Sequence, residues 1–140
     1  MNTITQQQAI ERVDRYIADA VVALPVDPQL TPTLEQLDGE CMDPTDNGPR
    51  NRIIVTKGYF LDGIPKDKES NRAYFGALRQ WWTSHGFRIL EDDRTGDMYL
   101  WVENNADGFR MSLQESAEGS VSLGANSPCI WPNGTPVPEP

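Results

Sequence analysis

The feature that most constrains the fold is a run of short alternating segments between residues 87 and 125. The alternation is clearest at 98–103, where every second residue is apolar and would lie on one face of a strand. Turn sequences rich in Asp, Asn, Ser and Gly separate the segments, at 93–96, 105–108 and 116–119. The pattern predicts a four-stranded antiparallel meander with one face buried and the other exposed to solvent.

Two amphipathic helices are predicted from apolar residues that recur at steps of three and four. The first covers about Thr5–Leu24, and either Thr3 or Thr5 could form a capping box with the glutamine three residues later. The second covers about Lys68–His85 and ends before Gly86, a typical residue after a helix end. The aromatic and leucine side chains of its apolar arc are Tyr74, Phe75, Leu78, Trp81 and Trp82.

One further strand is predicted at Arg52–Leu61, where β-branched and aromatic residues are concentrated, so the order of elements is α-β-α-β-β-β-β. We expect an α+β fold of two layers, an antiparallel sheet of about five strands with both helices on one face, cystatin-like or plait-like in topology. The length of 140 residues suits a single domain. Its predicted parts are an N-terminal helix (1–24), a proline-rich loop with a short helical turn at 33–37 (25–50), a sheet-and-helix core (51–126) and an extended proline-rich tail (127–140).

The charge balance excludes one large class of partners. Asp and Glu number 21 against 12 for Lys and Arg, which gives a formal net charge of −9. Nucleic acids are bound by basic surfaces, so we expect no nucleic-acid partner. No apolar run approaches the roughly 18 residues of a membrane helix, and no signal peptide follows Met1. Either the chain is cytoplasmic, or Met1 begins the mature form of an exported protein.

The two cysteines, Cys41 and Cys129, bear on that choice. Their separation excludes a CxxC redox or zinc motif. They could be two reduced thiols, or one disulfide that closes a long loop. Both lie in loop-like sequence, whereas free cysteines are usually buried as small hydrophobic side chains. These surroundings favour a disulfide, and with it an oxidising compartment.

The stretch Ser-Pro-Cys-Ile-Trp-Pro at 127–132 resembles a pattern in small actinobacterial secreted proteins and predicted lipoproteins of unknown function. Further matching pieces are 12–14, 41–46, 81–86 and 107–113. In such proteins a signal peptide, and often a lipid-bearing cysteine, precedes the first helix. The resemblance implies a Cys41–Cys129 disulfide and a place at the cell envelope, with the membrane contacted only through an N-terminal lipid anchor ahead of this sequence. It implies no catalytic residues.

The sequence offers little support for catalysis or metal binding. His85 is the only histidine, and its place at the end of an aromatic helix face is typical of a capping or packed side chain. The acidic turns at 92–97 and 43–46 do not have the spacing of a calcium loop and are explained by turn chemistry. Nucleotide-binding and hydrolase motifs are absent. We expect a protein that is not an enzyme, with no catalytic residue, no metal and no cofactor.

Two surfaces are candidates for binding. Tyr99 and Trp101 would point away from the core, and Arg88 and Arg110 would share that outer face. Aromatic and arginine side chains are enriched where proteins bind partners. The main hypothesis is therefore a non-catalytic envelope domain that binds a protein or another envelope component. The alternative is a small-ligand pocket between the second helix and the sheet, lined by Tyr74, Phe75, Trp81 and Trp82.

Overall fold

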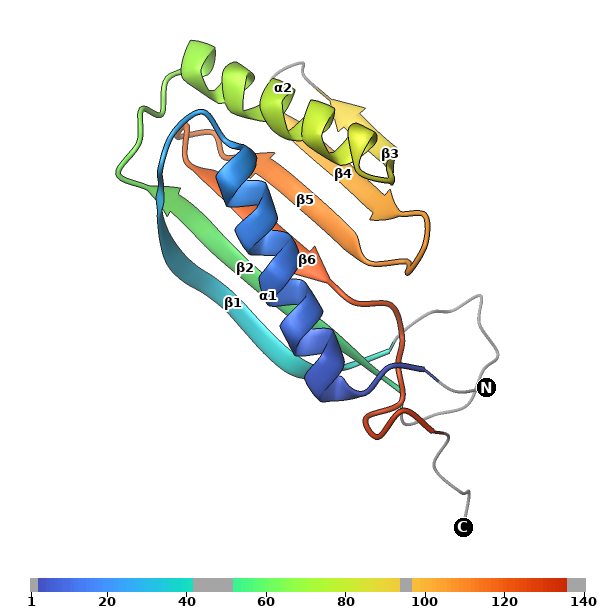
Figure 1. Ribbon diagram of the computed structural model, residues 1–140. Coiled ribbons are helices and arrows are strands. Elements are labelled where there is room, and N and C mark those ends of the chain that lie inside the picture. The colour runs from blue at the N-terminus through green and yellow to red at the C-terminus, as the bar shows by residue number, and fades with distance from the viewer. Residues whose placement is uncertain (1–2, 42–51, 94–96, 136–140) are drawn as a thin grey trace.

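Two helices lie on one face of a six-stranded sheet in the computed structural model, which describes residues 3–41, 52–93 and 97–135 (Figure 1). The helices are α1 (Gln6–Ala23) and α2 (Lys68–Ser84). The strands are β1 (Gln29–Glu40), β2 (Ile53–Asp62), β3 (Phe87–Asp93), β4 (Tyr99–Asn104), β5 (Arg110–Glu115) and β6 (Val121–Asn126). The predicted α+β class with two layers is confirmed, with six strands in place of about five. Neither helix of the described chain is long and apolar enough to cross a membrane.

Capping side chains determine where the helices begin. The Thr5 hydroxyl accepts a hydrogen bond from the Gln8 N–H at 3.1 Å, and the Gln8 side chain accepts one from the Thr5 N–H at 2.9 Å. This is the capping box predicted for Thr5. At the start of α2 the Asp67 carboxylate accepts the Ser70 N–H at 3.2 Å. The helix ends before Gly86, whose φ of +85° is the left-handed conformation typical of that position.

The strand order of the sheet is β1-β2-β6-β5-β4-β3, and each neighbouring pair is antiparallel. After the β1–β2 hairpin, α2 carries the chain to the far edge of the sheet (Figure 1). The four-stranded meander predicted from the alternation then returns strand by strand, until β6 pairs with β2. The topology is therefore a hairpin joined through α2 to a meander.

The structure corrects the prediction of a loop with a helical turn over 25–50. Residues 29–40 form β1, an edge strand that pairs along β2 with register shifts after Pro32 and Gln36. Most of its side chains are exposed, so no apolar alternation marks it as a strand. Proline is tolerated there because an edge strand needs ladder partners on one side only. The loop residues 42–50 lie outside the described part of the chain.

The hydrophobic core lies between the helices and the inner face of the sheet. The aromatic arc predicted for α2 supplies three of its largest side chains, Tyr74, Phe75 and Trp82, each at most 2% exposed. The apolar residues of the meander alternate inward as predicted, and the largest of them are Phe109, Met98, Leu100, Met111, Leu113 and Leu123.

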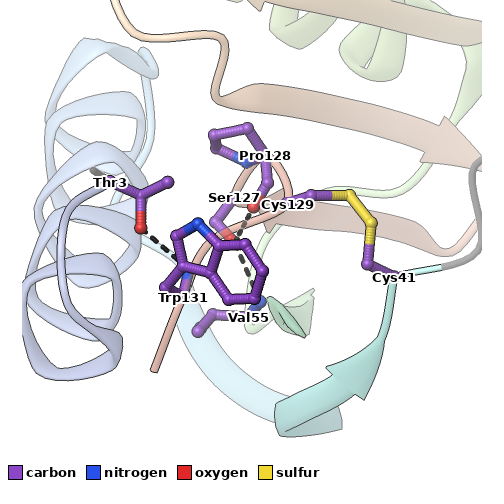
Figure 2. Close-up of a disulfide and its surroundings, with 7 residues drawn as sticks. All are labelled: Thr3, Cys41, Val55, Ser127, Pro128, Cys129 and Trp131. Carbon is purple, nitrogen blue, oxygen red and sulfur yellow. Dashed lines mark hydrogen bonds between the residues drawn. A yellow bond between two sulfur atoms is a disulfide. The ribbon is translucent and has the colours of Figure 1, made fainter. Parts of the chain in front are cut away.

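The described residues of the predicted tail, 127–135, are held against the body of the fold rather than extended from it. Ile53 and Ile130 exchange backbone hydrogen bonds of 2.8 and 2.9 Å, which continues the sheet beyond the end of β6. The Trp131 N–H donates to the hydroxyl of Thr3 at 2.8 Å, and the Trp131 side chain is buried (Figure 2). The segment thus joins β2 to the residues ahead of α1.

Candidate functional site

The face of the sheet opposite the helices, here called the outer face, is covered by no described helix or strand (Figure 1). Two large apolar side chains stand exposed on it, Leu34 at 50% and Phe60 at 42%. Tyr99 and Trp101 lie on the same face and are half-buried. An uncovered face that carries several large apolar side chains is a candidate for binding.

A hollow of about 150 Å³ lies at the centre of the outer face. Strand register places five residues in one line across β1, β2, β6, β5 and β4: Leu34, Gly58, Gly124, Ser112 and Trp101. The three middle residues are the smallest, so the larger ones stand at the sides. This cavity, here called the outer hollow, is lined by Thr33, Leu34, Thr56, Lys57, Gly58, Ser112, Ser122, Leu123, Gly124, Ala125 and Asn126.

Gly58 and Gly124 have no side chains, and this leaves space for the outer hollow above the strands that carry them. A Cβ atom on Gly124 would lie 2.9 Å from the Ser112 hydroxyl, and one on Gly58 would lie 3.0 Å from the Thr33 hydroxyl. Glycine weakens a strand interior, and it commonly marks a place where something approaches the backbone closely. Here the approaching groups are these two hydroxyls.

The four residues predicted as an interaction surface are brought together on the outer face, on strands β3, β4 and β5. The Arg110 guanidinium lies over the Trp101 ring, 5.0 Å from its centroid. Glu103 accepts from Arg110 at 3.1 Å through one carboxylate oxygen and from Arg88 through the other. Tyr99 lies two residues before Trp101 on β4, on the same face of the sheet. Both arginines are therefore paired with an acid that the sequence analysis did not single out.

Polar side chains without a partner surround the outer hollow. Five of the polar side chains that line it form no hydrogen bond to another described residue: Thr33, Thr56, Ser112, Ser122 and Asn126. Hydroxyl side chains elsewhere mostly do form such bonds, among them Thr3, Thr5, Thr31, Ser70, Thr83, Ser84, Ser116 and Ser127. The outer hollow therefore concentrates hydrogen-bonding groups that the fold itself does not use.

The pocket predicted between the second helix and the sheet is not formed by the four expected residues. Tyr74 and Phe75 are packed in the core. Trp81 and Trp82 instead line a cavity of about 250 Å³ between α1 and the C-terminal end of α2. The other residues of this cavity are Arg15, Tyr16, Asp19, His85, Phe87 and Asn104.

The disulfide predicted between Cys41 and Cys129 is present, with the Cα atoms 5.7 Å apart (Figure 2). Cys129 also lines a cavity of about 380 Å³, together with Ile4, Phe109 and Pro128. Ser127 holds the segment to β2, because its hydroxyl accepts the Val55 N–H at 2.9 Å.

A second polar cluster joins α1 to the turn between β4 and β5. The Tyr16 hydroxyl donates to the Asp107 carboxylate, and the Arg12 guanidinium lies 3.6 Å from the same carboxylate. Burial, and then the hydrogen bond to the negative charge of Asp107, raise the pKa of Tyr16 well above its ordinary value. Because Asp107 also accepts the Phe109 N–H at 3.0 Å, this cluster acts as a structural tie.

The remaining titratable residues considered from the sequence have structural surroundings. His85 caps α2: its ring lies 3.5 Å from that of Trp81, and its Nδ1 lies 2.7 Å from the Trp81 carbonyl oxygen. Asp92 accepts from Arg79 at 2.9 Å, which ties β3 to α2. Among the described residues, no group of three or more His, Cys, Asp or Glu is arranged to hold a metal ion. The turn at 43–46 lies outside the described residues.

The comparisons with known proteins point to a fold rather than to an activity. No protein-family model matches the chain, and no curated protein is significantly similar to it in sequence. One solved structure is similar, that of the putative lipoprotein LppA from Mycobacterium tuberculosis. The likeness has a TM-score of 0.55 and covers 96% of this chain and 87% of that one, at 18% sequence identity. The chain therefore shares the fold of that protein over nearly its whole length.

Proposed function

We propose that this chain is a non-catalytic binding domain that acts outside the cytoplasm, at the cell envelope, and that the outer face is its contact surface. The observation that carries the proposal is the uncovered sheet face with its side chains Leu34, Phe60, Tyr99 and Trp101. A folded domain gains nothing by leaving such a face open, since covering apolar surface is favourable.

Two further observations support the location. A structural disulfide persists in oxidising compartments, and Cys41–Cys129 joins two positions 88 residues apart in the sequence. The solved structure with the same fold is described as a putative lipoprotein. In this proposal the membrane is reached through a lipid anchor ahead of the first helix, and the sheet is left free to contact an envelope component.

Oxidative footprinting of tryptophan and tyrosine tests the proposal. The folded protein is oxidised by hydroxyl radicals alone and in the presence of the envelope fraction of the cell that encodes it. We expect Trp101 and Tyr99 to become protected, while Trp81, half-buried on the opposite layer, keeps its rate of oxidation. Unchanged oxidation of Trp101 and Tyr99 would show that the outer face is not the contact surface.

The cavity of about 250 Å³ beside Trp81 supports a second candidate, the binding of a small molecule. Aromatic walls with a few charged groups at the mouth, here Arg15 and Asp19, are typical of ligand pockets. In the same footprinting experiment, protection of Trp81 by a soluble extract of small molecules, with Trp101 unaffected, would favour this candidate.

A further inference from the structure

We infer that the outer hollow binds a neutral glycan chain, a polymer rich in hydroxyl groups, and this inference rests on the proposed function because it names the ligand class for the same face. The hollow presents three unpartnered hydroxyls and one unpartnered amide on its floor, from Thr56, Ser112, Ser122 and Asn126. Each of these groups can both donate and accept a hydrogen bond. A sugar hydroxyl has the same double capacity, so the two sets can satisfy each other.

The aromatic side chains stand at the sides of the hollow. Phe60 on β2 and Tyr99 on β4 belong to one line across the sheet, with Ser122 and Gln114 between them. Three strand spacings separate β2 from β4, about 14 Å, so the rings border the hollow without closing it. The faces of aromatic rings are electron-rich and attract the slightly positive C–H groups that line the flat side of a sugar ring.

This arrangement is the reverse of a protein–protein contact. Protein interfaces have an apolar, aromatic centre surrounded by a polar rim. Here the centre is polar and floored by Gly58 and Gly124, and the apolar residues lie at the margin. An extended peptide also finds no backbone to pair with, because β2, β6 and β5 already use their hydrogen-bonding groups within the sheet.

The charges around the hollow favour an uncharged ligand. On a chain with a net charge of −9, the side chains that face the hollow are all uncharged. Lys57, whose backbone contributes to the lining, directs its ammonium group to Asp14 of α1 at 2.7 Å. Two cations of the outer face, Arg110 and Arg88, are both paired with Glu103. A phosphorylated or otherwise anionic polymer would compete with Glu103 for these two arginines, whereas a neutral glycan needs no cation.

The test uses the insoluble envelope fraction in three forms: untreated, digested with protease, and oxidised with periodate, which cleaves the vicinal diols of sugars. Depletion of the folded protein from the supernatant measures binding. We expect equal binding to the untreated and protease-digested forms. After periodate we expect binding about tenfold weaker, because losing the net contribution of about one hydrogen bond lowers the affinity by about this factor. Binding that protease abolishes and periodate spares would overturn the glycan inference and leave the proposed contact surface standing. No binding to the untreated form would overturn both.

Variants locate the binding to the hollow. Ser112→Leu places a larger outward-facing side chain in the hollow and should weaken binding about tenfold. Trp101→Ala removes an aromatic ring at the side of the hollow and should have a similar effect. The matched control is Ala18→Leu, at an exposed position on α1, which should bind normally. Far-ultraviolet circular dichroism of each variant confirms folding. Full binding by folded Ser112→Leu would contradict the inference, because the ligand would then lie elsewhere.

Discussion

The disulfide between Cys41 and Cys129 lies directly beside the antiparallel bridge between Ile53 and Ile130. Cys41 follows the edge strand β1, and Cys129 belongs to the segment after β6 that pairs with β2. One covalent bond therefore joins the end of the outermost strand to the C-terminal segment, and the Ile53–Ile130 bridge pairs that segment with the start of β2.

Reduction of this disulfide should destabilise the protein strongly. The two cysteines are 88 residues apart, and closing a loop of that length restricts the unfolded chain by about 4.6 kcal/mol in the chain-entropy description. Urea unfolding with and without reductant measures the loss, and reductant should leave the Cys41→Ser/Cys129→Ser double variant unchanged. Intact mass after thiol blocking provides the direct check. If both thiols of the freshly isolated folded protein are alkylated without reduction, the bridge is absent and a cytoplasmic location is favoured.

A buried carboxylate, Glu115, gives the fold a dependence on pH. It accepts from Lys68 Nζ at 2.6 Å, from the Asn71 amide at 2.7 Å and from the Met98 N–H at 3.3 Å. Burial alone would raise its pKa, but these hydrogen bonds outweigh burial and hold the pKa of Glu115 below its ordinary value. The carboxylate thus stabilises the folded state above the unfolded pKa of about 4.3, and this stabilisation is lost as the pH falls through the folded value.

Glu115→Gln tests that dependence. The substitution should lower the free energy of unfolding at pH 7 by about 1–3 kcal/mol, because a buried group loses its charge-assisted bonds. The difference from the wild type should shrink as the pH falls below about 4.3, where the wild-type carboxylate also becomes protonated. The control is Glu118→Gln, at an exposed position of the following turn, with an expected change within about 0.5 kcal/mol. A difference that is constant from pH 7 to acid would contradict the assigned direction of the pKa shift.

The Tyr16 hydroxyl should contribute more to stability than that of a comparable tyrosine. Tyr16→Phe keeps the edge-on ring contacts with Phe87 and Phe109 but removes the hydrogen bond to the Asp107 carboxylate. We expect a loss of about 1.5 kcal/mol in the free energy of unfolding at pH 7. In the described part of the chain the Tyr59 hydroxyl has no hydrogen bond, so Tyr59→Phe should be nearly neutral. Equal effects of the two substitutions would show that the Asp107 tie contributes no stability.

The sequence predicted those elements in which buried and exposed residues alternate with a clear period. In β4, Leu100 and Val102 are fully buried and Trp101 is outward, so the period of two is visible without any tertiary information. The edge strand β1 escaped prediction because its structure depends on pairing with β2, and exposed side chains leave no apolar pattern. Local sequence carries little information about such a strand.

The candidate site was predictable only in part, for a related reason. Tyr99, Trp101, Arg88 and Arg110 lie on neighbouring strands of the meander, and alternation alone places them on one face. The outer hollow depends on β6 pairing with β2, which brings Gly124 beside Gly58 from a segment more than sixty residues away. The signal that was present is the outward phase of Ser112, Ser122 and Gly124 opposite buried Leu113 and Leu123.

The turn between β5 and β6 requires glycine at position 119, and this can be tested by a pair of glycine substitutions. Gly119 has a φ of +90°, and a Cβ atom there would lie 2.7 Å from the Lys66 carbonyl oxygen. Gly119→Ala should therefore lower the free energy of unfolding by about 2–3 kcal/mol, because both the backbone conformation and the neighbouring loop must shift. Gly76 provides the opposite case: it lies within α2, its φ is not positive, and an added Cβ would have no atom within 4 Å apart from its neighbours and the backbone of the helix itself. Gly76→Ala should stabilise the protein by about 0.5–1 kcal/mol, since alanine loses less backbone freedom in a helix.

Urea unfolding of both variants beside the wild type measures the two effects. Because the change of residue is identical, a difference in sign can only come from where each glycine lies. If Gly119→Ala were as stable as the wild type, the close approach of the turn to Lys66, and with it the position of the Asn71 and Glu115 cluster beside that turn, would be wrong.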